Sequence, residues 1–168
     1  MSPDATLFRE VMSQFATGIT VVTTRADGQI HGLTVNAFCS VSLEPPLVLV
    51  CINRNGYFHE LVTTSRFFAV NILGEDQEHL SRRFAIPEVS PSERFRSVCY
   101  RMEATGAPVL NDALGWLDCR LTSSYPAGDH TVFIGEIVAL GRTNGTKPLV
   151  FFQSRYHRGD MSHLNGTS

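Results

Sequence analysis

Residues Gly32 to Leu43 read GLTVNAFCSVSL, and this stretch carries the prediction of the fold. At the two-residue period of a strand, alternate positions are all apolar: Leu33, Val35, Ala37, Cys39, Val41 and Leu43. The other positions, called the polar ledge below, are Thr34, Asn36, Phe38, Ser40 and Ser42. An ordinary half-exposed strand explains this alternation, and so does a strand whose hydroxyls bind a phosphate or a polyol. The alternation alone favours the ordinary strand.

Further strands are expected on both sides of this stretch. Residues Ile19 to Thr24 are rich in β-branched side chains, and Asp27-Gly28 predicts a hairpin turn before Gln29. After Pro45-Pro46, the apolar run Leu47 to Ile52 predicts a strand that is buried on both faces. The remaining strands are expected at Phe67 to Leu73, Val109-Leu110, Leu114 to Tyr125, Thr131 to Arg142 and Pro148 to Phe152.

Helices are few in the prediction. Residues 1–16 form an amphipathic helix that Ser2 caps and Pro3 begins, and its apolar stripe packs on the barrel or on a second subunit. Gly56 to Thr64 and Glu75 to Ala85 are the other two helices, and Ile86 to Ser97 is a loop. Most strands follow one another without a helix between them, which excludes parallel βαβ units. We therefore expect a mainly β fold: a six- to seven-stranded antiparallel Greek-key barrel with a few short helices.

Composition places the chain among compact single-domain proteins. It has 168 residues, 43% of them hydrophobic, with a net charge of −2, so one domain over 1–168 is expected, with a frayed tail at 159–168. This charge gives no attraction to nucleic acid or to an anionic membrane. Neither the four cysteines nor the six histidines show a metal-binding spacing, and no metal is expected. With no leader-like start and no apolar run near ~20 residues, a cytoplasmic protein is expected.

Several segments, in this order, resemble the short-chain flavin reductases, the reductase components of two-component flavin monooxygenases. They are FATGITVVTT (Phe15 to Thr24), GLTVNAFCSVSLEPPLVLVCIN (Gly32 to Asn53), HLSRRFA (His79 to Ala85), GDH (Gly128 to His130) and PLVFFQSRYHR (Pro148 to Arg158). Each segment is a weak signal, whereas their order and spacing over Leu7 to Arg158 are specific. The resemblance implies an FMN-binding split barrel.

The resemblance also implies which residues bind FMN or FAD. The isoalloxazine and ribityl chain would lie against Thr34, Val35, Asn36, Ala37 and Phe38, with the phosphate near Ser40, Ser42, Ser81 and Arg83. Val41 would also belong to the flavin site. The flavin edge would be lined by Cys51, Ile52, Asn53, Arg54 and Asn55, and Phe84 and Ala85 would close the pocket. No GxGxxG motif follows a strand, so NADH or NADPH would bind without a Rossmann domain.

The Gly128-Asp129-His130 step has an ordinary interpretation and a functional one. Gly-Asp suits a tight turn between two long strands, and a lone histidine is often only a surface residue. In the family, a GDH step at this place contacts the nicotinamide nucleotide. The resemblance therefore implies that Gly128, Asp129, His130 and Tyr156 bind the nicotinamide, with His130 as the catalytic residue.

We expect an NAD(P)H-dependent flavin reductase that supplies reduced flavin to a partner monooxygenase, and that forms a homodimer. Because the flavin performs the hydride chemistry, no catalytic triad or carboxylate pair is needed. The alternatives are a flavin protein of the same fold with another acceptor such as a corrinoid or a quinone, and a non-enzymatic flavin carrier. A barrel-shaped interaction module without a cofactor is a third.

Overall fold

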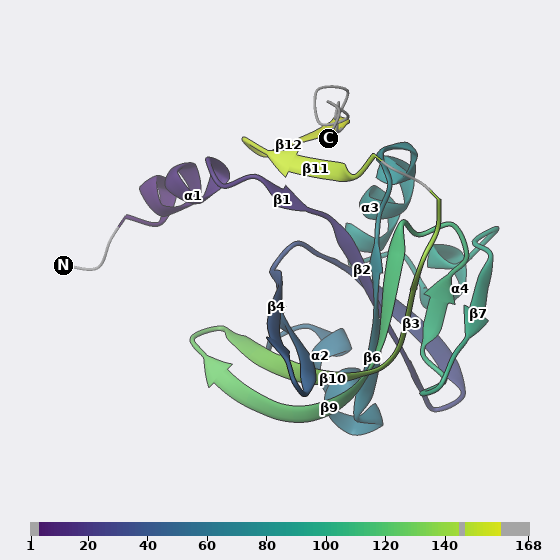
Figure 1. Ribbon diagram of the computed structural model, residues 1–168. Helices are drawn as coiled ribbons and strands as arrows, with labels where there is room; N and C mark the ends of the chain where they lie inside the picture. The colour runs from purple at the N-terminus through teal and green to yellow at the C-terminus, as the bar shows by residue number, and fades with distance from the viewer. Residues whose placement is uncertain (1–3, 145–146, 159–168) are drawn as a thin grey trace, which may run out of the picture.

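The computed structural model describes residues 4–144 and 147–158, and its centre is a seven-stranded antiparallel sheet (Figure 1). The strand order is β3-β2-β6-β9-β10-β5-β4. The bounds are β2 Thr20–Ala26, β3 Gln29–Val35, β4 Phe38–Leu43, β5 Pro46–Asn53, β6 Phe67–Ile72, β9 Gly115–Ala127 and β10 His130–Arg142. The predicted mainly β antiparallel fold is confirmed, and every pairing in this sheet is antiparallel.

Two smaller sheets flank the main one. β1 (Thr17–Gly18), β11 (Leu149–Phe152) and β12 (Arg155–Arg158) form the first, and β7 (Tyr100–Met102) pairs with β8 (Pro108–Leu110) in the second. The sequence did not predict β7 or β12, whose three or four residues are too short to show a periodic pattern.

Three helices were predicted, and the described residues contain four α-helices and one 3₁₀ helix. α2 (Tyr57–Ser65) and the pair η1 (Glu75–Gln77) and α3 (Glu78–Ala85) fall where helices were expected. Within the predicted loop, α4 (Pro91–Arg94) forms one turn that the Ser90 side chain caps. α1 (Ala5–Ser13) begins after Asp4, whose carboxylate accepts the Thr6 N–H at 3.1 Å. Asp4 is thus the N-cap in place of Ser2; Ser2 and Pro3 lie outside the described residues, as does the tail 159–168.

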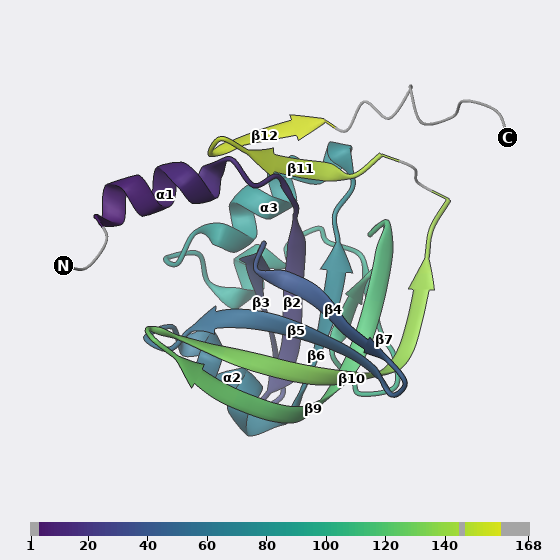
Figure 2. The same ribbon diagram turned by 60° about the vertical axis from the view of Figure 1, so that its left-hand side comes forward.

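Two hydrophobic cores lie on the two faces of the β2–β3–β6 half of the sheet. The inner core includes Val22, Val50, Ile52, Phe68 and Phe133, and the β4–β5–β10–β9 half lies across it (Figure 2). The outer core is covered by α3, α4 and the β11–β12 hairpin, and includes Val21, Leu80, Phe84, Phe95 and Leu149. The edge strands β3 and β4 are joined through Asn36 and Ala37, and no ladder in the described part of the chain links them.

The polar ledge is not one continuous face, and this part of the prediction is wrong. The strand is interrupted at Asn36-Ala37, where two residues lie outside the ladder. The alternate positions that face the core before this break are therefore not the ones that face it after the break. Leu33 packs against the inner core before the break and Phe38 does so after it. Cys39 and Val41 are consequently exposed, and Leu43, which follows a bulge and pairs with Pro46 at the end of the strand, is 90% exposed.

The strand β5 is buried on one face only, contrary to the prediction. Val48, Val50 and Ile52 enter the inner core, whereas Leu47, Leu49 and Cys51 are half-exposed on the outer face. These outward side chains continue the apolar surface of β4. The outer face of β5 is therefore an apolar surface that a ligand or a partner can contact.

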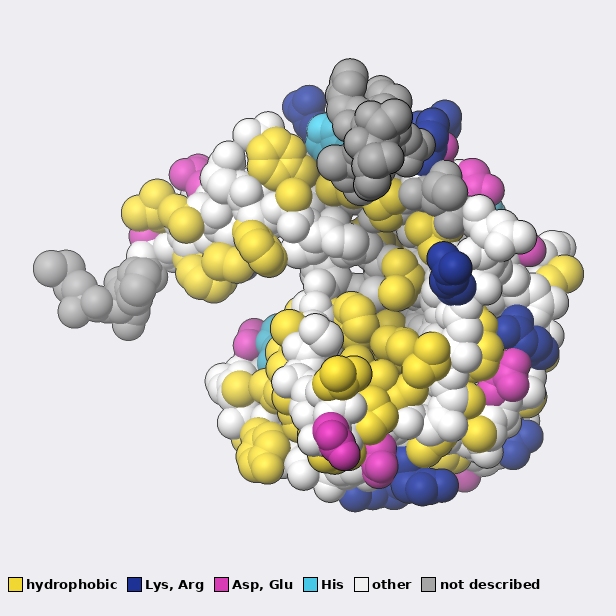
Figure 3. All heavy atoms as spheres, in the orientation of Figure 1, with side chains coloured by type: hydrophobic (Ala, Val, Ile, Leu, Met, Phe, Trp, Pro, Cys, Tyr) yellow, Lys and Arg dark blue, Asp and Glu magenta, His cyan; other side chains and the backbone are white. Residues whose placement is uncertain are grey.

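α1 does not pack on the sheet within the chain. It extends away from the body, and its apolar residues Leu7, Phe8, Val11, Met12 and Phe15 are all exposed (Figures 1 and 3). Of the two predicted surfaces for this stripe, packing on the chain's own barrel is excluded. Across 4–144 and 147–158, no helix is long and apolar enough to cross a membrane.

Candidate functional site

The predicted flavin and nicotinamide segments meet where β5 ends. His130 pairs with Asn53 across the β5–β10 ladder, and the Arg54 N–H donates to the Asp129 carbonyl at 2.9 Å. The Asn55 N–H donates to the Asn53 side-chain oxygen at 2.8 Å, which shapes the chain immediately after the strand. Gly128 has a φ of 63°, a conformation that favours glycine in this two-residue turn.

The turn also holds the His130 ring. Nδ1 of His130 lies 2.7 Å from Oδ1 of Asp129, and this hydrogen bond is the main cause that lowers the pKa of the Asp129 carboxyl. A carboxylate at that oxygen requires Nδ1 to be the donor, so Nε2 is the nitrogen left to meet a ligand. A neutral ring then accepts a hydrogen bond at Nε2, and a protonated ring donates one there.

A second group of predicted residues gathers where β3, α3 and β12 meet. The Thr34 hydroxyl donates to the Ser81 carbonyl at 2.7 Å, and the Ser81 hydroxyl lies 2.9 Å from the Tyr156 hydroxyl. The guanidinium of Arg82 covers the Tyr156 ring at 4.7 Å. Ser81 is fully buried with its hydroxyl already paired. The Tyr156 ring is also edge-on to Phe151, with centroids 5.3 Å apart, and the nicotinamide role of Tyr156 stays a prediction.

The other α3 residues point in different directions. Phe84 is fully buried in the outer core, edge-on to Phe95 with ring centroids 5.0 Å apart. Its ring is therefore part of the core and is not accessible to a ligand. The Arg83 guanidinium donates to the Arg96 carbonyl at 2.8 Å. On the edge strand β4, Ser40 and Val41 are exposed and Ser42 follows a bulge in the pairing with β5.

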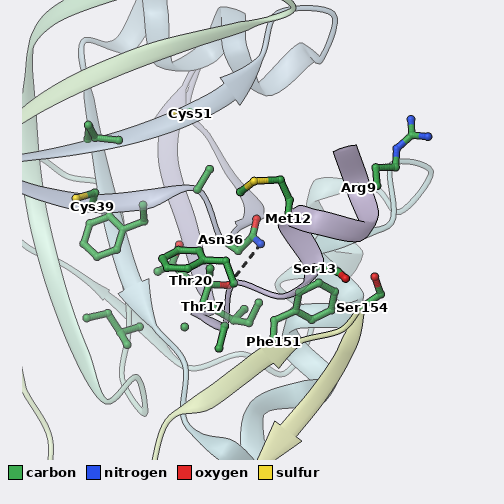
Figure 4. A pocket seen from close by; sticks show the side chains of 18 of the residues that line it. Arg9, Met12, Ser13, Thr17, Thr20, Asn36, Cys39, Cys51, Phe151 and Ser154 are labelled. Atoms are coloured by element: carbon green, nitrogen blue, oxygen red, sulfur yellow. Dashed lines mark hydrogen bonds between the residues drawn. The ribbon is translucent and has the colours of Figure 1, made fainter. Parts of the chain in front are cut away.

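A cleft of about 870 Å³ lies between α1 and the outer face of the sheet, and we call it the arm cleft (Figure 4). It brings together the predicted residues Asn36, Ala37, Phe38 and Cys51. The sequence analysis missed the rest of its lining, which includes Phe8, Met12, Phe15, Thr17, Thr20, Cys39, Leu49, Phe151 and Ser154. The apolar outward face of β5 and the amphipathic α1 were the signals for it.

The arm cleft is mostly apolar with a few polar groups. The Asn36 amide nitrogen lies 3.5 Å from the Thr17 hydroxyl, and the Thr20 hydroxyl donates to the Val35 carbonyl at 2.6 Å. Met12 points toward Asn36, whereas the Arg9 guanidinium is directed away (Figure 4). Burial raises the pKa of the Cys51 thiol, so this group is neutral at physiological pH.

Two smaller hollows hold further predicted residues, whereas the predicted residue Val35 is buried in the inner core. The first, called the His31 cavity, has about 420 Å³ and is lined by Ile52, Asn53, Asn55 and Ala85 together with His31, Tyr57 and Arg94. The second, called the turn hollow, has about 480 Å³ and is lined by Arg54, Asn55, His59, Glu60, Gly128 and Asp129. Sequence reasoning missed His31, Tyr57, His59 and Arg94, because isolated residues on three separate elements carry no motif.

Known proteins are similar to this chain over most of its length. The family model described as flavin reductase like domain matches residues 12–160. The chain belongs to this family. It is 40% identical to the NADH-dependent flavin reductase StyB of Pseudomonas fluorescens, over 92% of the chain and 89% of that protein.

Two further relatives bear on the cofactor and the partner. The reductase component of an FADH2-dependent resorcinol hydroxylase from a Rhizobium strain is 40% identical, over 89% of this chain and 84% of that protein. The structure of the Streptomyces globisporus NADH:FAD oxidoreductase SgcE6 with NAD and FAD fragments superposes with a TM-score of 0.86 at 36% identity, over 92% of each chain. The suspected resemblance is confirmed.

Within the described ranges, no three His, Cys, Asp or Glu side chains are close enough together to hold an ion. The four cysteines are free thiols, of which Cys119 is buried, and burial raises its pKa to about 12.

Proposed function

We propose that this flavin reductase family member transfers hydride from NADH to FMN or FAD bound in the arm cleft. The observation that carries the proposal is the hydrogen-bonded junction of the Gly128–His130 turn with Asn53–Asn55 at the end of β5. β5 also supplies the wall of the arm cleft through Leu49 and Cys51. One strand therefore links the flavin wall to the turn that would meet the nicotinamide.

The arm cleft fits an isoalloxazine ring. Its volume lies in the range of small-molecule sites, which combine an apolar lining with a few placed polar groups. Leu49, Cys51 and Phe38 supply flat apolar surface, and the Asn36 amide and the Thr17 hydroxyl supply donors and acceptors for a ring edge. The Ser81 hydroxyl is engaged by Tyr156, so a flavin phosphate would reach it only by displacing that contact.

The residues of the chain orient the reactants and exclude water. The bound flavin supplies the hydride-accepting N5, and the protein contributes geometry and electrostatics. Asp129 fixes the His130 ring through Nδ1, which leaves Nε2 to contact the carboxamide or a phosphate of the nicotinamide nucleotide. α1 forms one side of the arm cleft and limits the access of water.

Charges in the turn hollow favour NADH over NADPH. Glu60 and Asp129 bring two carboxylates and Arg54 brings one cation. Burial, and then the charge of Arg54, lower the pKa of His59, so its ring is neutral at physiological pH. The hollow is therefore net negative, and an additional 2′-phosphate there would be repelled. StyB and SgcE6 are NADH-dependent by name, which supports the same choice.

Steady-state oxidation of NADH and NADPH with FMN and with FAD tests this function. We expect a strong acceleration over the free reactants with NADH and a smaller one with NADPH. A rate equal to that of the reactants without protein contradicts the reductase function and leaves a flavin carrier of the same fold.

We also propose a cytoplasmic homodimer with the split-barrel fold that feeds a flavin-dependent monooxygenase. The apolar α1 and the outward residues Val41, Leu43 and Tyr125 are exposed in the single chain, which supports burial between two copies. The reductase-component name of the Rhizobium relative supports the monooxygenase. Light scattering on the full chain and on a variant without residues 1–16 tests the dimer, and equal monomeric masses contradict it.

A further inference from the structure

The histidine of α2 that lines the turn hollow contacts the strand that carries His130. His59 lies in the first turn of α2, and its Nε2 is 2.8 Å from the Thr131 hydroxyl. Thr131 directly follows His130 in β10 and is only 5% exposed. A buried hydroxyl needs a hydrogen-bond partner, and within the described part of the chain the His59 ring is the side chain that supplies it.

The backbone ladder around the start of β10 lacks one donor. Pro126 lies opposite Thr131 in the β9–β10 ladder and has no N–H to donate. On the β5 side, the Arg54 N–H donates to the Asp129 carbonyl at 2.9 Å. The side chain from α2 therefore gives a further connection, from a helix and not from a strand, to the residue beside His130.

The His59 ring is itself held by the inner core. It lies against the Phe133 ring, with centroids 5.2 Å apart and planes tilted by 49°. Phe133 is only 1% exposed, and α2 is anchored through its buried residues Phe58, Leu61 and Val62. A side chain that is locked by packing on an anchored helix holds its partner more precisely than a loop residue does. The contacts therefore run from the core through His59 to the start of β10.

The hydrogen bond brings no charge to the turn. The charged groups that act on His59 are Arg54 and Glu60, and Asp129 lines the same hollow. Burial is the main cause that lowers the pKa of His59, Arg54 lowers it further, and Glu60 raises it. Because the ring is neutral at physiological pH, its effect on the turn is positional. A neutral replacement of the ring leaves the charge of the hollow unchanged.

We propose that His59 is a positioning residue for the nicotinamide. Its hydrogen bond to Thr131 fixes the first residues of β10, and thereby the place of the His130 ring relative to the end of β5. Asp129 sets the direction in which that ring faces, and His59 sets where the ring stands. This role rests on the proposed reductase function, and it acts through Thr131 and not on the flavin.

Two variants remove the contact, one from each side. His59→Phe keeps a ring against Phe133 and removes the nitrogens, and Thr131→Val removes the hydroxyl with little change in shape. His59→Gln is the conservative variant, because its amide can still pair with the hydroxyl. The control His79→Phe removes an exposed imidazole on α3.

Steady-state kinetics with NADH at saturating flavin measures the effect on the reaction. We expect kcat/KM for NADH to fall about 2- to 13-fold in His59→Phe, the equivalent of one hydrogen bond, with an unchanged flavin Kd. His59→Gln should recover part of this loss, and His79→Phe should show none. Because both substitutions remove the same contact, combining His59→Phe with Thr131→Val should cost no more than the larger single loss.

Amide hydrogen exchange, followed by NMR on the full chain without NADH, gives a readout that does not depend on activity. The Arg54 N–H reports the turn, because it donates to the Asp129 carbonyl. The Leu73 N–H reports the rest of the fold, because it donates to the Ile19 carbonyl at 3.0 Å. We expect exchange at Arg54 to be about 2- to 13-fold faster in His59→Phe, with an unchanged rate at Leu73. Equal acceleration of both amides overturns the proposal.

The kinetic outcomes separate this role from the reductase function. An unchanged kcat/KM for NADH in a folded His59→Phe protein overturns the positioning role alone, as does an equal loss of flavin affinity. If the unmodified protein does not oxidise NADH, the reductase function fails and the nicotinamide role fails with it. The exchange rate at Arg54 then shows separately whether His59 holds the turn.

Discussion

Replacing Asn36 with alanine perturbs the proposed flavin site with little effect on the fold. The Asn36 side chain is exposed, and its hydrogen bond to the Thr17 hydroxyl, at 3.5 Å, is at the limit of such contacts. We therefore expect the free energy of unfolding to change by no more than about 0.5 kcal/mol. In the holoprotein, the amide would lose one hydrogen bond to the flavin, worth about 0.5–1.5 kcal/mol.

This loss corresponds to a rise in the flavin Kd of roughly 2- to 13-fold. Titration of flavin fluorescence measures the Kd, and thermal denaturation checks the fold. Asn111→Ala is the matched control, because Asn111 is also exposed but contacts Arg101 at 3.2 Å and does not line the arm cleft. A folded Asn36→Ala protein with the Kd of the unmodified protein would refute the placement of the flavin in the arm cleft.

Three further predictions concern the turn and the core. His130→Ala should raise the KM for NADH and leave the flavin Kd unchanged; an equal loss of both would show that His130 is structural. The hydrogen bond from His130 lowers the pKa of Asp129 in the folded protein. This hydrogen bond therefore stabilises the turn fully above the unfolded-state pKa of Asp129, and the stabilisation is lost as the pH falls through the folded-state pKa. The KM for NADH should rise over that acidic range. A KM that is constant with pH across that acidic range would oppose this role. Asn71→Leu should lower the free energy of unfolding, measured by urea denaturation, by about 2–4 kcal/mol. The substitution removes the hydrogen bonds that Asn71 makes to the buried Leu110 N–H at 2.8 Å and to the Val21 carbonyl at 3.0 Å. A change below about 1 kcal/mol would contradict this prediction.

Local signals in the sequence predicted the strands and turns well. Asp27 and Gly28 have φ values of 51° and 75°, which the hairpin prediction required. The Gly128-Asp129 turn joins β9 to β10 where it was expected. These features depend on backbone preferences of adjacent residues, so a single sequence contains them.

Features that depend on distant pairing could not be predicted in the same way. The parity reversal at Asn36-Ala37 follows from β3 pairing with β2 and β4 pairing with β5. The half-exposed face of β5 depends on what covers the sheet, and an apolar run alone does not distinguish a core neighbour from a ligand or a second copy.

The candidate site was predicted in its segments but not in its arrangement. The resemblance named Cys51 to Asn55 and Gly128 to His130, which the structure brings together. It also named Thr34, Ser81 and Tyr156, which meet elsewhere through side-chain contacts that no sequence pattern specifies. The cluster of His31, Tyr57 and Arg94 is visible only after β3, α2 and α4 are packed.

Anaerobic stopped-flow mixing of the flavin-loaded protein with NADH tests the central claim most directly. The absorbance of the oxidised flavin reports its reduction, and the same mixture without protein is the reference. We predict that the protein accelerates this loss of absorbance strongly and in a manner that saturates with NADH. A rate equal to that of free flavin with NADH would contradict the claim that this chain is a flavin reductase.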